Sequence, residues 1–206
     1  MKKALNKIGW WVFGLMAISI GIYPLLYFII DRKFGLLASK TEELLLDALW
    51  NTGFYTHIIL GGLALAIGWV QFSKKIRTQN LKLHRKIGNI YVTAACLSGI
   101  ASIYIGFYAT GGPISAVGFI LLGIFWFSTT FMALQYAKKG NIDAHQKMMI
   151  YSYAACFAAV TLRIWLPILI AILEDFIPAY RIVAWLCWVP NIIVAFFIIK
   201  RIGKTS

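Results

Sequence analysis

Six long apolar stretches divide the chain, and each is about long enough to cross a bilayer. The short segments between them hold nearly all of the charged residues. The predicted spans are residues 8–30, 54–73, 87–110, 114–137, 148–173 and 182–199. A backbone inside a bilayer must satisfy its own hydrogen bonds, so these spans are expected to be helices. We therefore expect an all-α integral membrane protein with a single transmembrane domain over residues 1–206.

The net charge of +13 follows a topological pattern that does not point to nucleic acid. With the N-terminus inside, fifteen Lys and Arg residues fall in inner segments and four in outer segments, whereas six of the seven acidic residues fall outside. An excess of Lys and Arg marks the cytoplasmic side of membrane proteins. This pattern predicts that both termini are cytoplasmic, and the inner basic run is also suited to attract anionic lipid heads.

A short pattern occurs twice in the chain. "QFSKK" begins at Gln71 and "QYAKK" at Gln135, and each is followed by a histidine with a lysine two positions on, "HRK" at His84 and "HQK" at His145. Each copy would join an outgoing helix to a returning one in the same membrane orientation. We therefore expect a core four-helix bundle built from a duplicated helical hairpin. Chance similarity is the alternative, because the match is short and gapped.

Three further features bear on the helices. Pro24, Pro167 and Pro190 fall inside predicted spans, and each is expected to kink its helix. Small residues between positions 61 and 68 predict close packing of the second helix. The longest outer loop, residues 31–53, contains "KTEELLLDALW", whose leucine spacing predicts either an interfacial amphipathic helix or a packed loop helix.

His84 and His145 open the third and fifth predicted helices and are expected at the same depth near the cytoplasmic face. Imidazole is a usual haem ligand, and helical bundles hold cofactors between facing helices. One hypothesis is therefore a b-type haem protein that transfers electrons, with His84 and His145 as axial ligands. A small metal ion on the same pair is a second hypothesis. A third is that both histidines are interfacial polar residues without a cofactor.

A second group of polar residues lies toward the outer face. His57 falls one turn into the second predicted helix, and Arg163 lies inside the fifth. A charge within the membrane is costly and needs a partner, and no acid lies in the predicted spans. We expect His57, Tyr55 and Arg163, with Asn51, to frame a polar pocket suited to a quinone head group or an anionic lipid. Structural capping of Arg163 is the alternative.

The chain lacks the motifs of hydrolases and of nucleotide-dependent enzymes, so the sequence leaves open whether it is an enzyme. Its three cysteines, Cys96, Cys156 and Cys187, have no CxxC spacing and are expected to be buried thiols. Besides the haem protein, two functions stay open. One is a non-enzymatic membrane subunit, or a lipid- or quinone-binding scaffold, of a larger complex. The other, more weakly supported, is a small-molecule permease.

Several motifs in the same order resemble a known family of bacterial membrane proteins, the domain-of-unknown-function 2306 family. The resemblance covers roughly residues 54–170. It rests on His57 with "GGLALAIGWVQF", on "LHRKIGNIYV", on His145 with Met149 and Ser152, and on "AAVTLRIWLP". It implies a multi-pass protein of the bacterial inner membrane and implies no activity.

The chain departs from the family pattern around His145. The family favours Arg directly after this histidine, Trp before the methionine and Arg two positions after it, where this chain has Gln146, Met148 and Tyr151. The departure puts a role of those basic side chains in doubt but not that of His145. The expected arrangement is also similar to that of four-helix b-type cytochromes, which hold haem between histidines of non-adjacent helices.

Overall fold

The computed structural model describes residues 2–30 and 33–203. Throughout these residues the regular structure is helical, and six segments are long and apolar enough to cross a membrane. These spans are Lys7–Ile29, Ala48–Phe72, Leu81–Gly106, Pro113–Lys138, Ile142–Leu173 and Phe176–Ile202. The predicted all-α class and the six predicted spans are therefore confirmed.

Several spans are made of more than one helix. The α-helices are α1 (Lys2–Ile22), α2 (Leu26–Ile29), α3 (Glu42–Leu46), α4 (Ala48–Gly68), α5 (Lys74–Gln79), α6 (Leu81–Gly106), α7 (Pro113–Lys138), α8 (Ile142–Cys156), α9 (Ala158–Leu173), α10 (Phe176–Leu186) and α11 (Val189–Ile202). The 3-10 turns are η1 (Tyr23–Leu25), η2 (Gly35–Ser39) and η3 (Trp69–Phe72). The second span thus begins at Ala48, six residues before the predicted start, because the Asp47 carboxylate caps α4 by accepting from Trp50 N at 2.7 Å.

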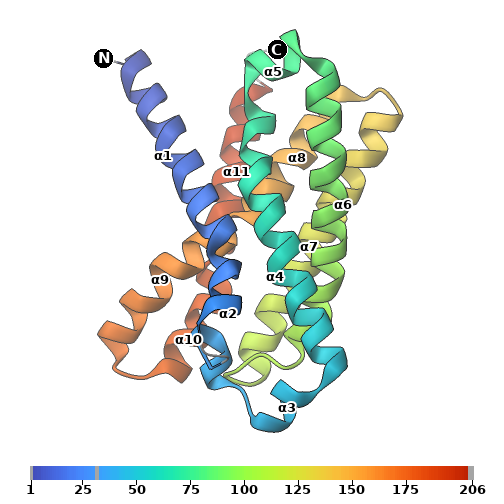
Figure 1. The fold of residues 1–206 in the computed structure, drawn as a ribbon. Helices are drawn as coiled ribbons and strands as arrows, with labels where there is room; N and C mark the ends of the chain where they lie inside the picture. The colour runs from blue at the N-terminus through green and yellow to red at the C-terminus, as the bar shows by residue number, and fades with distance from the viewer. Residues whose placement is uncertain (1, 31–32, 204–206) are drawn as a thin grey trace.

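The centre of the molecule is a bundle of α4, α6, α7 and α8, in which each helix packs along the next (Figure 1). Outside it, α1 packs on α4, α10 on α7 and α9, and α11 on α8. The start of α1 and the end of α11 lie at the same end as α5, whereas α3 lies at the opposite end (Figure 1). We call these the α5 end and the α3 end.

The two hairpins of the repeat are built alike at their returning helices. The Asn80 side chain caps α6 by accepting from Leu83 N at 3.0 Å, and Asn141 caps α8 by accepting from Ala144 N at 3.0 Å. An N-cap asparagine satisfies one of the free N–H groups at a helix start. Each cap lies four residues before its histidine, so His84 and His145 occupy the same position in the first turn of helices with the same orientation.

The last two spans are interrupted at the same level, near Phe157 and Cys187. Asn191 Nδ2 donates to Ala154 O at 3.3 Å and to Cys187 O at 3.0 Å, and Thr161 Oγ1 donates to Cys187 O. These side chains satisfy carbonyls that an interrupted helix leaves free within the membrane. Because of the break at Phe157, α9 turns away from the bundle (Figure 1).

The three prolines differ in whether they lie at an interruption of a helix. Pro24 lies in η1, which interrupts the first span, and Pro190 lies in the first turn of α11, just after the break at Cys187. Both agree with the predicted kinks. Pro167 lies inside α9, which continues past it, so the interruption of the fifth span lies about ten residues earlier in the chain than the proline suggested.

Small residues bring α1 and α4 into close contact, as the sequence predicts. A Cβ atom on Gly21 would lie 2.7 Å from Ala66 Cβ and 2.8 Å from Gly62 O, and one on Gly62 would overlap Gly21 O. A Cβ on Gly68 would lie 2.5 Å from a ring carbon of Tyr153. Close backbone approach of this kind is a main source of helix association in membranes.

Hydrogen bonds between side chains also join the central helices. Ser152 Oγ lies 2.8 Å from the Tyr91 hydroxyl and 2.6 Å from Thr130 Oγ1, and all three residues are buried. The Tyr153 hydroxyl donates to Leu65 O at 2.9 Å. These bonds connect α6, α7 and α8 with one another and α8 with α4, as expected where polar groups cannot reach water.

The loop before α4 folds back onto the bundle. Residues 31 and 32 of the predicted loop lie outside the described residues. Beyond them, α3 is only five residues long, with Leu45 buried at 2% exposure and Leu46 exposed. Leu37 and Leu45 pack in one cluster with Trp50 and Phe54 of α4. The segment therefore matches the packed-loop alternative better than a separate interfacial helix.

Candidate functional site

The structure brings the repeated histidines together at the α5 end. His84 and His145 are both half-buried and lie within electrostatic range of each other. No group of three or more His, Cys, Asp or Glu side chains within residues 2–30 and 33–203 is arranged to hold a metal ion. A metal ion on this pair would therefore need further ligands besides these two imidazoles.

The tautomers of the two imidazoles differ. His145 Nδ1 lies 2.9 Å from Ala133 O, a group that can only accept, so Nδ1 carries the proton and Nε2 keeps its lone pair. The amide of Gln71 is assigned with its nitrogen toward His84, the orientation that satisfies both ends of the group. In this orientation it donates to His84 O at 3.1 Å and to His84 Nδ1 at 2.5 Å, and its oxygen accepts from Gly88 N at 3.3 Å. This bond requires a lone pair on His84 Nδ1, which leaves the ring proton on Nε2. His145 is thus prepared for ligation, whereas His84 fits an iron ligand only after its contact with Gln71 is rearranged.

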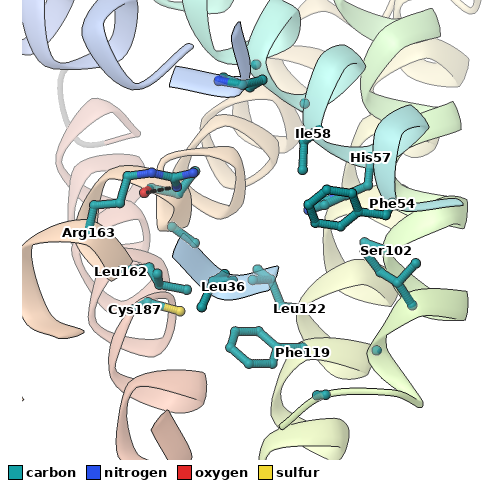
Figure 2. A pocket seen from close by; sticks show the side chains of 18 of the residues that line it. Leu36, Phe54, His57, Ile58, Ser102, Phe119, Leu122, Leu162, Arg163 and Cys187 are labelled. Atoms are coloured by element: carbon teal, nitrogen blue, oxygen red, sulfur yellow. Dashed lines mark hydrogen bonds between the residues drawn. The ribbon is translucent and has the colours of Figure 1, made fainter. Parts of the chain in front are cut away.

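The described cavity with the most polar lining lies away from the two histidines, between the centre of the bundle and the α3 end. It has a volume of about 210 Å³, and Figure 2 shows its walls. Its lining comes from every span and from the loop segment around η2. Most lining residues are apolar, three are basic (Lys40, His57 and Arg163), and none is acidic among the residues that the structure describes. The cavity therefore carries positive charge within an apolar wall.

Arg163 projects from α9 toward the cavity (Figure 2). Its Nη1 donates to Ala159 O, one turn earlier in the same helix, at 2.9 Å. Its guanidinium carbon lies 4.3 Å from the ring centre of Tyr23, a cation–π distance. Its Nε is buried and finds no hydrogen-bond acceptor among the described residues. A buried N–H without an acceptor is uncommon in folded proteins and calls for an explanation.

His57 lies across the cavity from Arg163 (Figure 2). Its Nδ1 lies 3.1 Å from Ser98 Oγ and 3.2 Å from Ser98 O, and Ser98 Oγ donates to His57 O at 2.9 Å. Because the Ser98 hydroxyl proton is directed to His57 O, the imidazole Nδ1 must be the donor toward Ser98. The neutral ring therefore keeps a lone pair on Nε2, which is available to accept a hydrogen bond.

The third basic residue, Lys40, was not anticipated as a site residue. Lys40 Nζ donates to Tyr108 O and, at 3.0 Å, to Thr110 Oγ1, and Ser39 Oγ lies 2.9 Å from the same Thr110 hydroxyl. These contacts fix η2 against the loop between α6 and α7. Leu36 and Leu37 of η2 line the cavity, so this segment covers it at the α3 end.

Two of the predicted pocket residues lie outside the cavity lining. Tyr55 contacts the rings of Phe28 and Phe54, each at 5.3 Å between centroids. Asn51 Nδ2 donates to Leu45 O at 2.8 Å and thereby holds α3 against the start of α4. His57 and Arg163 do share the cavity, and their binding of a ligand stays a prediction.

Lys40 should give the fold a measurable pH dependence. Burial lowers the pKa of Lys40 from 10.5 to about 8. Between these values the unfolded chain holds a proton that the folded chain has lost, so the free energy of unfolding should rise as pH increases from 8 to about 10. The stability gained in this way is lost again as pH falls through 8. We expect the melting temperature of the wild type, relative to Lys40→Met, to rise over this window in detergent.

The matched control is Lys82→Met, which removes an exposed lysine at the α5 end. Its melting temperature should follow that of the wild type at every pH. A constant difference between wild type and Lys40→Met from pH 7.5 to 10 would contradict the lowered pKa.

A family model described as "Predicted membrane protein (DUF2306)" matches residues 54–199. No curated protein and no solved structure matches the chain. The matched region contains His57, His84, His145 and Arg163, whereas Lys40 and the segment that covers the cavity precede it.

Proposed function

The chain belongs to the DUF2306 family of predicted membrane proteins, and from its cavity we propose that it binds a membrane-borne amphiphile. The proposed ligand has an oxygen-bearing head group, either a quinone ring or an anionic lipid head. The observation that carries the proposal is Arg163, a lining residue of the cavity whose buried Nε has no acceptor among the described residues. None of the described lining residues is acidic.

The cost of placing the Arg163 charge in a membrane helix supports a further partner for its guanidinium. A charged side chain near the centre of a membrane helix costs about 2.5–3.5 kcal/mol when it is inserted by the cellular machinery. The contacts described for Arg163 are one carbonyl of its own helix and the face of Tyr23. A head-group oxygen within the cavity would give the guanidinium an acceptor that the described residues do not provide, and charge-assisted bonds of this kind are the stronger ones.

The walls of the cavity fit the rest of such a molecule. Phe54, Phe119 and Leu122 supply flat and branched apolar surface, and His57 supplies an acceptor on the side opposite Arg163 (Figure 2). Ligand pockets are typically apolar with a few convergent polar groups. The chain would then serve as a lipid- or quinone-binding protein, either alone or as a subunit of a larger membrane complex.

Thermal shift of the detergent-purified protein tests this function. Two probes are used: decylubiquinone, which is neutral, and hexadecanoate, which is anionic. At least one should raise the melting temperature of the wild type and of His84→Ala, whose change lies at the α5 end, but raise that of His57→Ala less. No shift with either probe in the wild type would contradict the proposal.

A second candidate function rests on the pairing of His84 and His145 in equivalent helix turns. Haem would supply one-electron redox chemistry when bound, and the chain would supply the two imidazoles. The hydrogen bond from Gln71 to His84 opposes this arrangement, because it places the proton on the nitrogen that iron would need. For this reason we rank the haem function below the binding of an amphiphile.

The optical spectrum separates the two candidates. Protein expressed with added haem should show no sharp reduced α-band and no stoichiometric iron, because the Gln71 hydrogen bond disfavours His84 as a ligand. Gln71→Leu would free His84 Nδ1 and is the variant most favourable to haem. A Soret band that requires both His84 and His145 but not His57 would instead establish a b-type cytochrome.

The proposed location is the bacterial inner membrane, with the α5 end in the cytoplasm. The α5 end carries the basic segment from Lys74 to Lys86 and the last turn of α11, with Lys200 and Arg201. Such basic segments mark the cytoplasmic side. Cysteine labelling from outside the cell should therefore modify an introduced thiol in α3 and leave one in α5 unmodified.

A further inference from the structure

A second cavity shares Arg163 with the first one as a lining residue. It has a volume of about 290 Å³ and lies between α1 and α9, where the two helices diverge (Figure 1). Its lining is Leu15, Met16, Ser19 and Ile20 of α1 with Val160, Arg163 and Ile164 of α9. Ile20 and Arg163 line both cavities. Arg163, whose Nε has no acceptor among the described residues, therefore borders both the cavity inside the bundle and the gap between two membrane helices.

The two cavities differ in chemistry and in access. The second one is apolar apart from Ser19 and Arg163, and its wall residues Leu15 and Ile164 are 66% and 42% exposed on the surface that faces the bilayer. The first cavity is covered at the α3 end by η2, which Ser39 and Lys40 hold against Thr110. The second cavity thus opens toward hydrocarbon, whereas η2 lies over the first one at the α3 end.

Volume limits what the first cavity can hold. Sites for drug-sized ligands usually measure about 300–1,000 Å³, so a cavity of about 210 Å³ accommodates a compact head group but not a long chain. A hydrocarbon tail attached to a head group at Arg163 must leave the cavity. The apolar gap between α1 and α9 is the described route that begins at the same side chain.

The guanidinium favours an anionic head. Nη1 is engaged by Ala159 O, and the unpartnered Nε belongs to the other edge of the group, on which a carboxylate can accept two parallel hydrogen bonds. No acidic residue among the described residues lining either cavity competes for this edge. Lys40 is held by acceptors of the loop between α6 and α7, so Arg163 is the cation left for a ligand.

We infer that the ligand is a single-chain carboxylate whose head pairs with Arg163 and whose hydrocarbon tail runs between α1 and α9 into the bilayer. This inference rests on the proposed function and specifies both the head group and the route of entry. A long-chain fatty acid has the required chemistry. The neutral alcohol of the same length shares the tail and lacks the charge, which makes it the matched control ligand.

Binding is measured on the full chain in lipid nanodiscs, with radiolabelled hexadecanoate and hexadecan-1-ol and with subtraction of empty discs. We expect saturable binding of hexadecanoate, at least tenfold weaker binding of hexadecan-1-ol, and at least tenfold weaker binding of hexadecanoate to Arg163→Gln. Arg85→Gln, which changes an exposed arginine at the α5 end, should bind as the wild type does. Equal affinity for the acid and the alcohol would overturn the carboxylate assignment.

The route of the ligand is tested by bridging the gap between α1 and α9 in one variant and by locking η2 over the first cavity in another. The double variant Ser19→Cys and Ile164→Cys, joined by a cleavable bis-thiol reagent, should lose binding at least tenfold and recover it on cleavage. The double variant Ser39→Cys and Thr110→Cys, oxidised to a disulfide, should bind normally, because it locks only the cover of the first cavity. Each single-cysteine variant serves as a folding control. Unchanged binding to the bridged α1–α9 variant would overturn the route.

The failure of this inference is distinguishable from the failure of the proposed function. Arg163-dependent binding of decylubiquinone, with no binding of hexadecanoate, would overturn the fatty-acid assignment and leave an amphiphile-binding cavity. Failure of all three probes to bind the wild type would overturn both.

Discussion

Arg163→Gln is expected to abolish stabilisation by ligand while leaving the ligand-free protein about as stable as the wild type. The substitution removes an incompletely satisfied charge from the membrane together with one helix carbonyl bond and one cation–π contact. These effects oppose each other, so the net change should be within about 1 kcal/mol. A ligand at one hundred times its Kd stabilises the wild type by about 2.7 kcal/mol, and the variant should lose this stabilisation.

The measurement is the melting temperature in detergent, with and without ligand. For a chain of this size, the lost stabilisation corresponds to a shift of about 5 °C or more. Arg163→Lys, which keeps the charge but lacks the planar fork, should retain only a small part of the ligand effect. If Arg163→Gln unfolded without ligand at a much lower temperature, and the ligand shift persisted in Arg163→Lys, Arg163 would be structural.

Gly62→Ala is expected to produce the largest loss of stability in the ligand-free protein. A single methyl group at this position would overlap the backbone oxygen of Gly21, so α1 and α4 would have to separate. Overpacking of this kind costs about 1–3 kcal/mol. The contact lies against backbone rather than against a flexible side chain, and we therefore expect the upper half of that range.

Gly9→Ala provides the matched control, since it makes the same chemical change in α1 at a position with nothing within 4 Å. Its melting temperature should equal or slightly exceed that of the wild type, because alanine favours a helix over glycine. Equal melting temperatures for Gly62→Ala and Gly9→Ala would show that the crossing of α1 and α4 tolerates extra volume, contrary to the geometry.

The spans could be predicted because burial in lipid requires long apolar runs, whereas the interruption at Phe157 has no comparable local signal. No proline or glycine stands there. The break is stabilised by Thr161 and Asn191, whose partners include the Cys187 carbonyl of the neighbouring span. Such compensation depends on two segments meeting in three dimensions, so the sequence pointed instead to Pro167, inside a helix that continues.

The residues of the site likewise divide into those that the sequence predicts and those that it does not. Arg163 and His57 stand out in apolar segments, and the structure places both on one cavity. Tyr55 lies two residues from His57, and two residues correspond to about 200° around a helix, which places Tyr55 on the opposite side. The helical period starting from His57 leads instead to Phe54 and Trp50, which do line the cavity. Lys40 could not be found in this way, because it reaches the cavity only through the folded loop.

The tautomers of the repeated histidines could not be predicted from the sequence either. The repeat predicts equivalent positions, and the asparagine caps agree with it. The partners of Nδ1 nevertheless differ, since His145 contacts a backbone carbonyl and His84 a side-chain amide. Equivalence in the chain therefore does not establish equivalence in ligation.

Native mass spectrometry of the full chain, released from detergent micelles, shows directly whether Arg163 holds an amphiphile. The wild type should carry a bound amphiphile as a defined mass increment. The proposed binding at Arg163 requires that this increment is lost from Arg163→Gln and retained in Arg85→Gln. An increment of equal occupancy in Arg163→Gln, or wild-type protein that stays free of any increment after incubation with hexadecanoate and decylubiquinone, would contradict it.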